Sequence, residues 1–224
     1  MSGKTLIGVD VGGTFTDLFL FDGATGRFAT AKTPSQRGDE ARGFLAGLDA
    51  LGRIHEFGAV VHGTTVGTNA LLERKGARVG LITTAGFRDV LEMRRRDRPQ
   101  TWGLAGDFIP VVDRDLRVEI AERTLADGTV RVVVDPEEVA ARARELAAMG
   151  AEALAIVFIN AYANAENEQR ALAAVREVWR NDYVTASHEV LAEIREFERA
   201  STAALNAYLQ PVVASYIAKL ETAM

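Results

Sequence analysis

Apolar and polar residues alternate along three short segments at the start of the chain, and this alternation predicts three successive β-strands. The segments cover residues 6–11, 14–21 and 28–33. Asp22 and Gly23 supply a tight turn between the second and the third segment. Apolar residues then recur at helical spacing from Ala41 to Leu51, and Gly52 is typical of the residue after a helix C-terminus. We therefore expect an antiparallel group of strands followed by a helix.

Strand and helix patterns alternate along most of the remaining chain. We expect strands at 59–61, 79–83, 154–159 and 183–185, and helices at 68–74, 136–150, 165–179 and from 205 onward. Asp135 and Pro136 are typical of an N-cap and of the first helical position. An alternating segment at 115–134, which contains Asp127-Gly128, predicts an inserted hairpin. Three antiparallel strands followed by alternating helices and strands predict an α/β fold with a mixed sheet.

Composition narrows the class of protein without giving an activity. The chain has 224 residues and is 48% hydrophobic, which suits one large or two small globular domains. Its net charge of -5 argues against non-specific binding to nucleic acid or to an anionic membrane. The absence of cysteine excludes disulfides, thiol nucleophiles and cysteine-ligated metals. Residues 153–159 form an apolar block too short to span a bilayer, and the N-terminus does not resemble a signal sequence, so we expect a soluble cytoplasmic protein.

The most informative stretch is LIGVDVGGTFTDLFLF, which begins at Leu6. Strand alternation places Asp10 on one face of the first strand and Val9 on the other. Gly12 and Gly13 follow directly, and glycine permits a positive φ and lets a ligand approach the main chain closely. The chain then returns at once into a second strand, so the carboxylate and the glycines lie at the tip of the predicted sheet.

The residues after the two glycines predict an anion-binding turn. Successive amides of Gly13, Thr14 and Phe15 can form a nest for a phosphate group. Thr14 and Thr16 fall on one face of the returning strand, whereas Phe15 points to the other face and can anchor the turn. A carboxylate at Asp10 beside such a nest suits a nucleotide bound with Mg²⁺, the metal being held through water.

Two better-known phosphate loops do not fit this stretch. The Walker loop and the dinucleotide fingerprint both open a helix, whereas TFTDLFLF has the pattern of a strand. An ordinary Gly-Gly hairpin between core strands would explain the glycines, but neither Asp10 nor the paired threonines. We therefore favour the phosphate-binding turn.

A second segment, HGTTVGTN at 62–69, ends a strand and leads into a helix. His62, Thr64, Thr65 and Asn69 could contact a γ-phosphate or a substrate carbonyl, because hydroxyls and free amides at a helix start favour anionic oxygen. Helix capping by the threonines and a hydrogen-bonded core histidine form the alternative, which the residues alone slightly favour. The arginine-rich run at 94–99 is first of all typical of a solvated face, and alternatively of a site for a carboxylate or phosphate.

The stretch GVDVGGTFTD resembles the first phosphate loop of the superfamily that contains actin and the sugar kinases. Together with residues 60–95 and 193–213, it is similar to the hydantoinase A / 5-oxoprolinase family, which includes ketone-carboxylase subunits. The three blocks occur in the right order and cover nearly the whole chain. The resemblance implies an actin-like ATPase (ribonuclease H-like) lobe at 4–186 with an insertion at about 86–135. Residues 187–224 would form a helical segment that starts the following hydantoinase A domain.

The resemblance also implies ATP and Mg²⁺ as cofactors and the activation of a carbonyl group by phosphorylation. It implies catalytic roles for Asp10, His62, Thr64 and Thr65, with Asp10 holding Mg²⁺ through water. Cofactor binding would fall to Gly12, Gly13, Thr14, Phe15 and Thr16, and substrate binding to Asn69 and Arg98. Arg98 is chosen from the arginine-rich run because the family has an Arg-Pro pair in this region.

The function that the resemblance implies is that of the N-terminal part of an ATP-dependent hydrolase of cyclic amides, such as hydantoin, 5-oxoproline or another lactam. A subunit of an ATP-dependent ketone carboxylase is an alternative, as are a sugar or acyl kinase-like lobe and a non-catalytic scaffolding lobe. Phe15 disfavours the kinase, because kinases with the GGTK motif carry lysine at that position.

Family members are longer, and the sequence contains no second phosphate loop after Asp17. We therefore expect a fragment or split subunit that is inactive alone. Its partners would be the missing C-terminal region or a hydantoinase B-like subunit, within an enzyme that forms an oligomer and acts on a small-molecule substrate.

Overall fold

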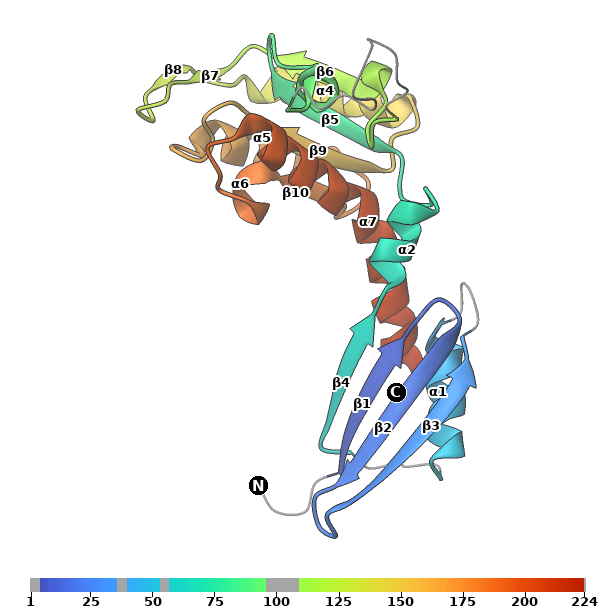
Figure 1. Ribbon diagram of the computed structural model, residues 1–224. Coiled ribbons are helices and arrows are strands. Elements are labelled where there is room, and N and C mark those ends of the chain that lie inside the picture. Colours follow the sequence, from blue (N-terminus) through green and yellow to red (C-terminus); the bar gives the residue numbers. More distant parts are fainter. Residues whose placement is uncertain (1–4, 36–39, 53–56, 96–108, 224) are drawn as a thin grey trace, which may run out of the picture. The chain divides into compact units, whose positions relative to one another are not determined.

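The computed structural model describes residues 5–35, 40–52, 57–95 and 109–223. The chain divides into two compact units: unit 1 comprises residues 1–75 and 212–224, and unit 2 comprises residues 76–211. Each unit contains its own four-stranded sheet (Figure 1). The long helix α7 (Glu196–Ala223) passes through Pro211 and has residues in both units. No helix in the described ranges is both long and apolar enough to cross a membrane.

The sheet of unit 1 has the strand order β3-β2-β1-β4. Its strands are β1 (Thr5–Val11), β2 (Phe15–Asp22), β3 (Arg27–Pro34) and β4 (Ala59–Thr64). The first three strands are antiparallel, as predicted, whereas β4 is parallel to β1. A parallel neighbour needs a crossover connection, and α1 (Glu40–Ala50) supplies it. The short helix α2 (Val66–Leu72) follows β4.

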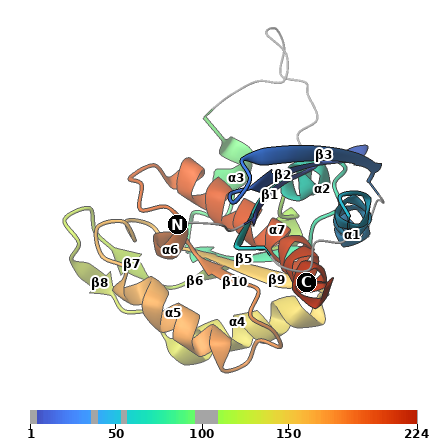
Figure 2. The ribbon, with the colours of Figure 1, turned by 90° about the horizontal axis from the view of Figure 1, so that it is seen from below.

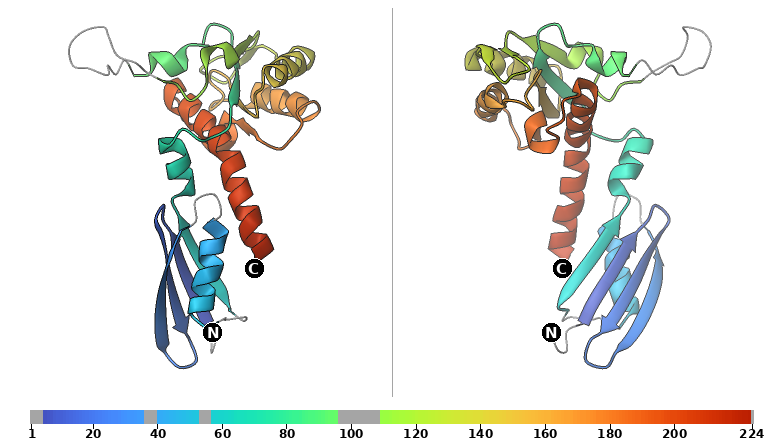
Figure 3. Two further views of the ribbon diagram at one scale, coloured as in Figure 1. Left: turned by 90° about the vertical axis from the view of Figure 1, so that its right-hand side faces the viewer. Right: turned by 60° about the vertical axis from the view of Figure 1, so that its left-hand side comes forward.

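The two faces of this sheet differ sharply. One face is buried against α1, and its core consists of Ile7, Val9, Val11, Leu18 and Phe44, each at most 4% exposed. The opposite face carries Leu6, Phe19, Phe21, Phe28 and Val61, which are between 38% and 74% exposed. No described helix of unit 1 lies over that face, as the right-hand view of Figure 3 shows. The strand alternation predicted for 6–11 is therefore confirmed, with one covered and one open face.

Unit 2 contains a parallel sheet with the strand order β10-β9-β5-β6. Its strands are β5 (Val79–Thr84), β6 (Arg117–Ile120), β9 (Ala153–Val157) and β10 (Val184–Ala186). Figure 2 shows α4 (Pro136–Ala148) and α5 (Glu166–Arg176) on one face of the sheet, and the first part of α7 on the other. Asp135 caps α4 as predicted, since its carboxylate accepts a hydrogen bond from the Glu137 amide at 3.0 Å. The remaining elements of unit 2 are α3 (Val90–Met93), the 3₁₀ helix η1 (Arg114–Leu116), β7 (Arg123–Thr124), β8 (Val130–Val132) and α6 (Ser187–Val190).

The α/β fold class predicted from the sequence is confirmed, but the strands form two main sheets, one mixed and one parallel. The predicted hairpin at 115–134 is smaller than expected. Only β7 and β8 form it, around Gly128 at φ 85°, and β6 pairs instead with β5. Alternation shows which face of a strand is buried, but it does not show which strand lies beside it. The division predicted at 186/187 stays a prediction.

Candidate functional site

The turn between β1 and β2 consists of Gly12, Gly13 and Thr14. The Gly12 amide donates to the Phe15 carbonyl at 3.0 Å and closes the turn. The amides of Gly13 and Thr14 have no hydrogen-bond partner among the described residues. Backbone amides left unpaired at a turn are suited to anionic oxygen. The geometry therefore agrees with the predicted nest at two of its three amides.

The two glycines are needed for space rather than for an unusual φ. Neither Gly12 nor Gly13 is in the left-handed region, which differs from the predicted positive φ. A Cβ on Gly12 would lie 3.1 Å from the Phe15 carbonyl oxygen, and one on Gly13 would lie 3.3 Å from Asn69 Nδ2. Both distances are tighter than nine in ten real Cβ contacts. A larger residue would therefore require the neighbouring group to shift by a few tenths of an ångström.

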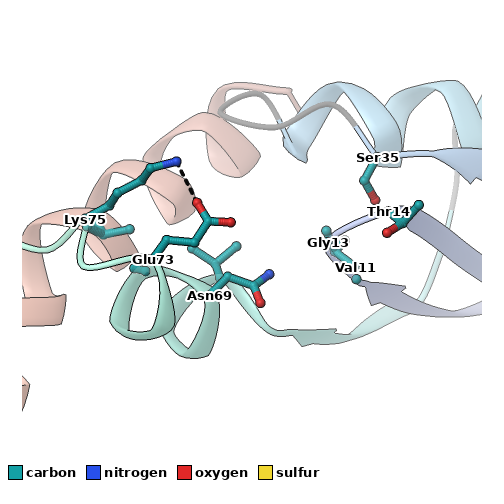
Figure 4. A pocket seen from close by; sticks show the side chains of 11 residues that line it. Val11, Gly13, Thr14, Ser35, Asn69, Glu73 and Lys75 are labelled. Carbon is teal, nitrogen blue, oxygen red and sulfur yellow. Dashed lines mark hydrogen bonds and ion pairs between the residues drawn. The ribbon is translucent and has the colours of Figure 1, made fainter.

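The turn opens into a pocket of about 410 Å³. Its polar lining comes from the turn, from Ser35 just after β3, and from Asn69, Glu73 and Lys75 in and after α2. In Figure 4 the Asn69 amide points from α2 toward Gly13, and the Thr14 and Ser35 hydroxyls lie at the other side of the pocket. All of these residues belong to unit 1. The pocket therefore combines free amides, two hydroxyls, a carboxamide and one ion pair.

Thr16 and Phe15 do not line this pocket. Thr16 is fully buried, and its hydroxyl lies 3.0 Å from the Ser35 hydroxyl, while the Ser35 amide donates to the Thr14 carbonyl at 2.9 Å. Thr16 thus fixes Ser35 in place beside the turn. Phe15 points to the other face, as predicted, but it is 45% exposed and its ring contacts the Lys32 ammonium at 5.0 Å from the centroid, so it is not buried.

Asp10 lies on the face opposite to Val9, as strand alternation predicts, and this is the open face of the sheet. It lines a different hollow of about 760 Å³. Its register partner on β2 is Asp17, which binds Lys32 Nζ at 3.0 Å. Gly63 is opposite on β4, and a Cβ there would lie 3.5 Å from Asp10 Oδ1. The Asp10 carboxylate is exposed and has no ion-pair partner in the described ranges.

A magnesium ion would find no ready-made cage here, since the described residues include no group of three or more metal-binding side chains. One exposed carboxylate nevertheless fits this metal, which commonly keeps several waters and binds one or two carboxylates together with substrate phosphates. Asp10 is therefore compatible with the predicted water-mediated role.

His62 faces the covered side of the sheet rather than either hollow. Its Nε2 shares a hydrogen bond with the Tyr216 hydroxyl, and its ring meets Phe44 edge-on with centroids 6.4 Å apart. Burial lowers the pKa of His62 below its usual 6.5, against an opposing effect of the Asp10 charge. This environment matches the structural interpretation of a hydrogen-bonded core histidine.

Thr64 and Thr65 also lie outside the pocket lining. The Thr64 hydroxyl accepts from the Val66 amide at 3.2 Å, and the Thr65 hydroxyl accepts from Asn69 Nδ2 at 3.1 Å. Thr65 therefore orients Asn69, the member of the second segment that reaches the turn. The structure thus brings together Gly12, Gly13, Thr14 and Asn69, and it does not bring Asp10, His62 or the two threonines into the same pocket. Arg98 lies outside the described residues.

Sequence reasoning missed Ser35, Glu73 and Lys75. Each follows the end of a strand or helix, where polar residues are common and give little signal. Within residues 193–213, the third block of the family resemblance, Arg199 has a structural role, since it is fully buried and donates to the Phe158 carbonyl at 2.7 Å.

The fold and the turn together define an α/β protein with a phosphate-suited turn at the tip of a mixed sheet. Residues 6–179 match the hydantoinase/oxoprolinase N-terminal region, and the chain belongs to this family. The family membership inferred from the three sequence blocks is therefore confirmed.

Characterised relatives of two kinds are similar to nearly the whole chain. The caprolactamase alpha subunit of Pseudomonas jessenii is 36% identical, over 96% of this chain and 32% of that protein. The acetophenone carboxylase gamma subunit of Aromatoleum aromaticum is 34% identical, over 91% of this chain and 31% of that protein.

Two solved structures share the fold. The ATP-dependent caprolactamase of Pseudomonas jessenii superimposes with a TM-score of 0.84 at 36% identity, over 97% of this chain and 33% of the other. Nucleotide-free acetone carboxylase, from work on ATP-dependent acetone carboxylation, gives a TM-score of 0.85 at 27% identity, over 100% of this chain and 34% of the other. This similarity agrees with the predicted actin-like lobe. The chain spans about a third of the length of these relatives.

Proposed function

We propose that this chain supplies the nucleotide-phosphate site of an ATP-dependent enzyme that activates a carbonyl group for hydrolysis of a cyclic amide. The observation that carries the proposal is the pair of unpartnered amides at Gly13 and Thr14, which open into a polar pocket at the sheet tip. Its support comes from relatives that are ATP-dependent, one of which is named for its action on caprolactam, a cyclic amide.

In this proposal the γ-phosphoryl group of ATP passes to the amide oxygen, with release of ADP. Water then attacks the activated carbon, the ring C–N bond breaks, and phosphate leaves. Phosphoryl transfer asks a protein mainly for positioning and for stabilisation of charge. The turn amides would bind phosphate oxygens, and Thr14, Ser35 and Asn69 would orient them. Asp10 would hold Mg²⁺ through water, where the metal neutralises phosphate charge.

The predicted catalytic roles of His62, Thr64 and Thr65 remain part of this proposal in a narrower form. Thr65 would act by orienting Asn69, because its hydroxyl accepts the Asn69 side-chain hydrogen bond. His62 would support the strand end through Tyr216. Substrate contact by Arg98 stays a prediction.

A ketone carboxylase subunit is the second candidate, because the acetophenone and acetone carboxylases are similar over nearly the whole chain. In that case a ketone or its enolate and bicarbonate would be activated instead of an amide. Both candidates use the same phosphate site. In both, the other two thirds of the enzyme or a further subunit would complete the reaction, and we propose that this chain alone is inactive.

The test is calorimetric titration of Mg²⁺-ATP into the 224-residue chain, with Asp10→Ala and Gly13→Val variants. We expect weak binding that falls about tenfold or more in both variants. Asp10→Ala removes the carboxylate that would hold Mg²⁺, and Gly13→Val blocks the close approach of phosphate to the turn. Asp49→Ala, which removes an exposed carboxylate from α1, is the matched control and should bind normally. Binding that is unchanged in Gly13→Val would contradict the assigned site, and no binding at all would favour a scaffolding lobe.

Titration of caprolactam and acetone into a chain joined to the remaining region would separate the two candidates.

A further inference from the structure

The chain just after α2 is held in a distinctive reversal. The Arg74 amide donates to the Leu71 carbonyl at 3.2 Å, and the Lys75 amide donates to the Ala70 carbonyl at 2.8 Å. These two bonds form a Schellman motif, in which one residue adopts the left-handed conformation. That residue is Arg74, with φ 56°, although glycine is preferred at such a position. These bonds fix the main chain of Lys75 at the C-terminal end of α2, where Lys75 lines the pocket.

Lys75 and Glu73 form an ion pair inside the pocket lining. Lys75 Nζ lies 2.6 Å from Glu73 Oε2, and the two side chains are 69% and 39% exposed. Figure 4 shows this pair across the pocket from Thr14 and Ser35. Of the pocket-lining residues, Lys75 is the one cation and Glu73 the one carboxylate in the described ranges. Among the described lining residues, this pair therefore supplies the charges of the pocket.

We propose that Lys75 is a phosphate ligand of the pocket and that Glu73 is the counter-ion that binds Lys75 while the pocket is empty. This inference rests on the proposed function, because it concerns the same anion at the same turn. An exposed ion pair contributes little stability, so its ammonium group can be transferred to a ligand at small cost. Lysine also suits this exchange, because its charge is compact and its stem is long and flexible.

Glu73 has the opposite effect on an anion. Its carboxylate lies in the same pocket, so a bound phosphate must both compete for Lys75 and tolerate a negative neighbour. Glu73 is therefore expected to lower the affinity for phosphate, and Lys75 to raise it. Left-handed Arg74 serves this arrangement, since backbone strain of this kind persists where the surrounding structure holds it and is often found at ligand sites.

The test is a titration of the 224-residue chain with inorganic tripolyphosphate, followed by the amide NMR signals of Gly13 and Thr14. We expect Lys75→Ala to weaken binding about tenfold, because it removes a charge-assisted contact to phosphate. Glu73→Gln should tighten binding about threefold, because it frees Lys75 and removes the repulsion. The double variant should bind about threefold more weakly than the unchanged protein, because it lacks the ligand but also the competing carboxylate. The salt dependence of binding should become shallower in Lys75→Ala.

Lys219→Ala is the matched control, since Lys219 is an exposed lysine of unit 1 that does not line the pocket. If the Gly13 and Thr14 signals shift on titration but Lys75→Ala binds like the control, the role of Lys75 is wrong and the phosphate site stands. Weaker binding in Glu73→Gln would also contradict the proposal that Glu73 competes with phosphate for Lys75. If neither signal shifts in the unchanged protein, the proposed phosphate site itself fails, and the inference fails with it.

Discussion

The two sheets of this protein differ in how their residues are used. In unit 2, all six residues of β5 and all five of β9 are buried, because helices cover both faces. In unit 1, β1 and β2 alternate between buried and exposed residues, because one face remains open. Parallel sheets covered on both faces have continuous apolar strands, whereas half-covered sheets alternate. The two sequence patterns thus record two different environments within one chain.

Polar groups follow the same division. In unit 2, buried Glu168 accepts hydrogen bonds from the Phe158 amide, the Ser187 hydroxyl and both the amide and the Nδ1 of His188. In unit 1, the amides of Gly13 and Thr14 open into a pocket and have no partner in the described ranges. Buried polar groups that bind each other stabilise a fold, whereas unpaired accessible ones are available to a ligand. The Glu168 network of unit 2 is therefore structural, whereas the two turn amides of unit 1 remain accessible to a ligand.

The largest expected effect tests this contrast at Glu168. Glu168→Ala removes a fully buried carboxylate, leaves its donors unpaired and deprives buried Arg199 of a neighbouring negative charge. We expect the free energy of unfolding to fall by about 4 kcal/mol. Urea unfolding followed by the fluorescence of Trp179, a buried residue of unit 2, measures it. A loss below about 1 kcal/mol would show that the network is not structural.

A second comparison concerns packing on the two sheets. Ile156→Ala empties a fully buried position in β9, and we expect a loss of about 3 kcal/mol. Val61→Ala changes a side chain that is 74% exposed on the open face of unit 1, and we expect a loss below about 0.5 kcal/mol. Urea unfolding followed by circular dichroism compares the two. Similar losses at both positions would mean that the open face is covered in solution.

A third prediction concerns the strained backbone of unit 1. Arg74→Gly should be more stable than Arg74→Ala by about 1 kcal/mol, because glycine adopts the left-handed conformation without steric cost. The comparison of two side-chain deletions removes the effect of the contacts that arginine makes. Thr68, in the middle of α2, is the control, where glycine should be less stable than alanine by about 1 kcal/mol. Thermal unfolding of the four variants measures both differences. If the glycine variant were the more stable one at both positions, or the less stable one at both, the prediction would be wrong.

A smaller effect separates the two described histidines by pH. A hydrogen bond to Glu168 raises the pKa of His188 above its usual 6.5, whereas burial lowers the pKa of His62 below that value. The contribution of His188 to stability is therefore present below pH 6.5 and is lost as pH rises through its folded pKa. For His62 the neutral form is favoured, so stability is present above pH 6.5 and is lost as pH falls through its folded pKa.

NMR titration of the two imidazole rings measures these directions, and urea midpoints of His188→Gln and His62→Gln link them to stability. We expect His188→Gln to lose the decrease in stability that occurs as pH rises, and His62→Gln to lose the decrease that occurs as pH falls. If both histidines changed the stability in the same direction with pH, the assigned environments would be wrong.

The sequence by itself determined the local elements and the family. Alternation from Thr5 to Val11 fixed which side chains share a face, and it placed Asp10 on the face opposite to Val9. Asp135 marked the start of α4, and the two glycines marked the turn. These features depend on neighbouring residues, whose spacing along the chain already fixes their directions.

Only the tertiary structure decided which distant residues meet. The partner of β6 is β5 rather than the following strand, because burial in the unit 2 sheet outweighs a local hairpin. Ser35 and Lys75 join Gly13 and Thr14 in one pocket, whereas His62 turns to Tyr216. Such contacts depend on strand register and on the crossing of helices over sheets. A one-residue change of register reverses every side chain of a strand, so periodicity gives a residue's face but not its neighbours.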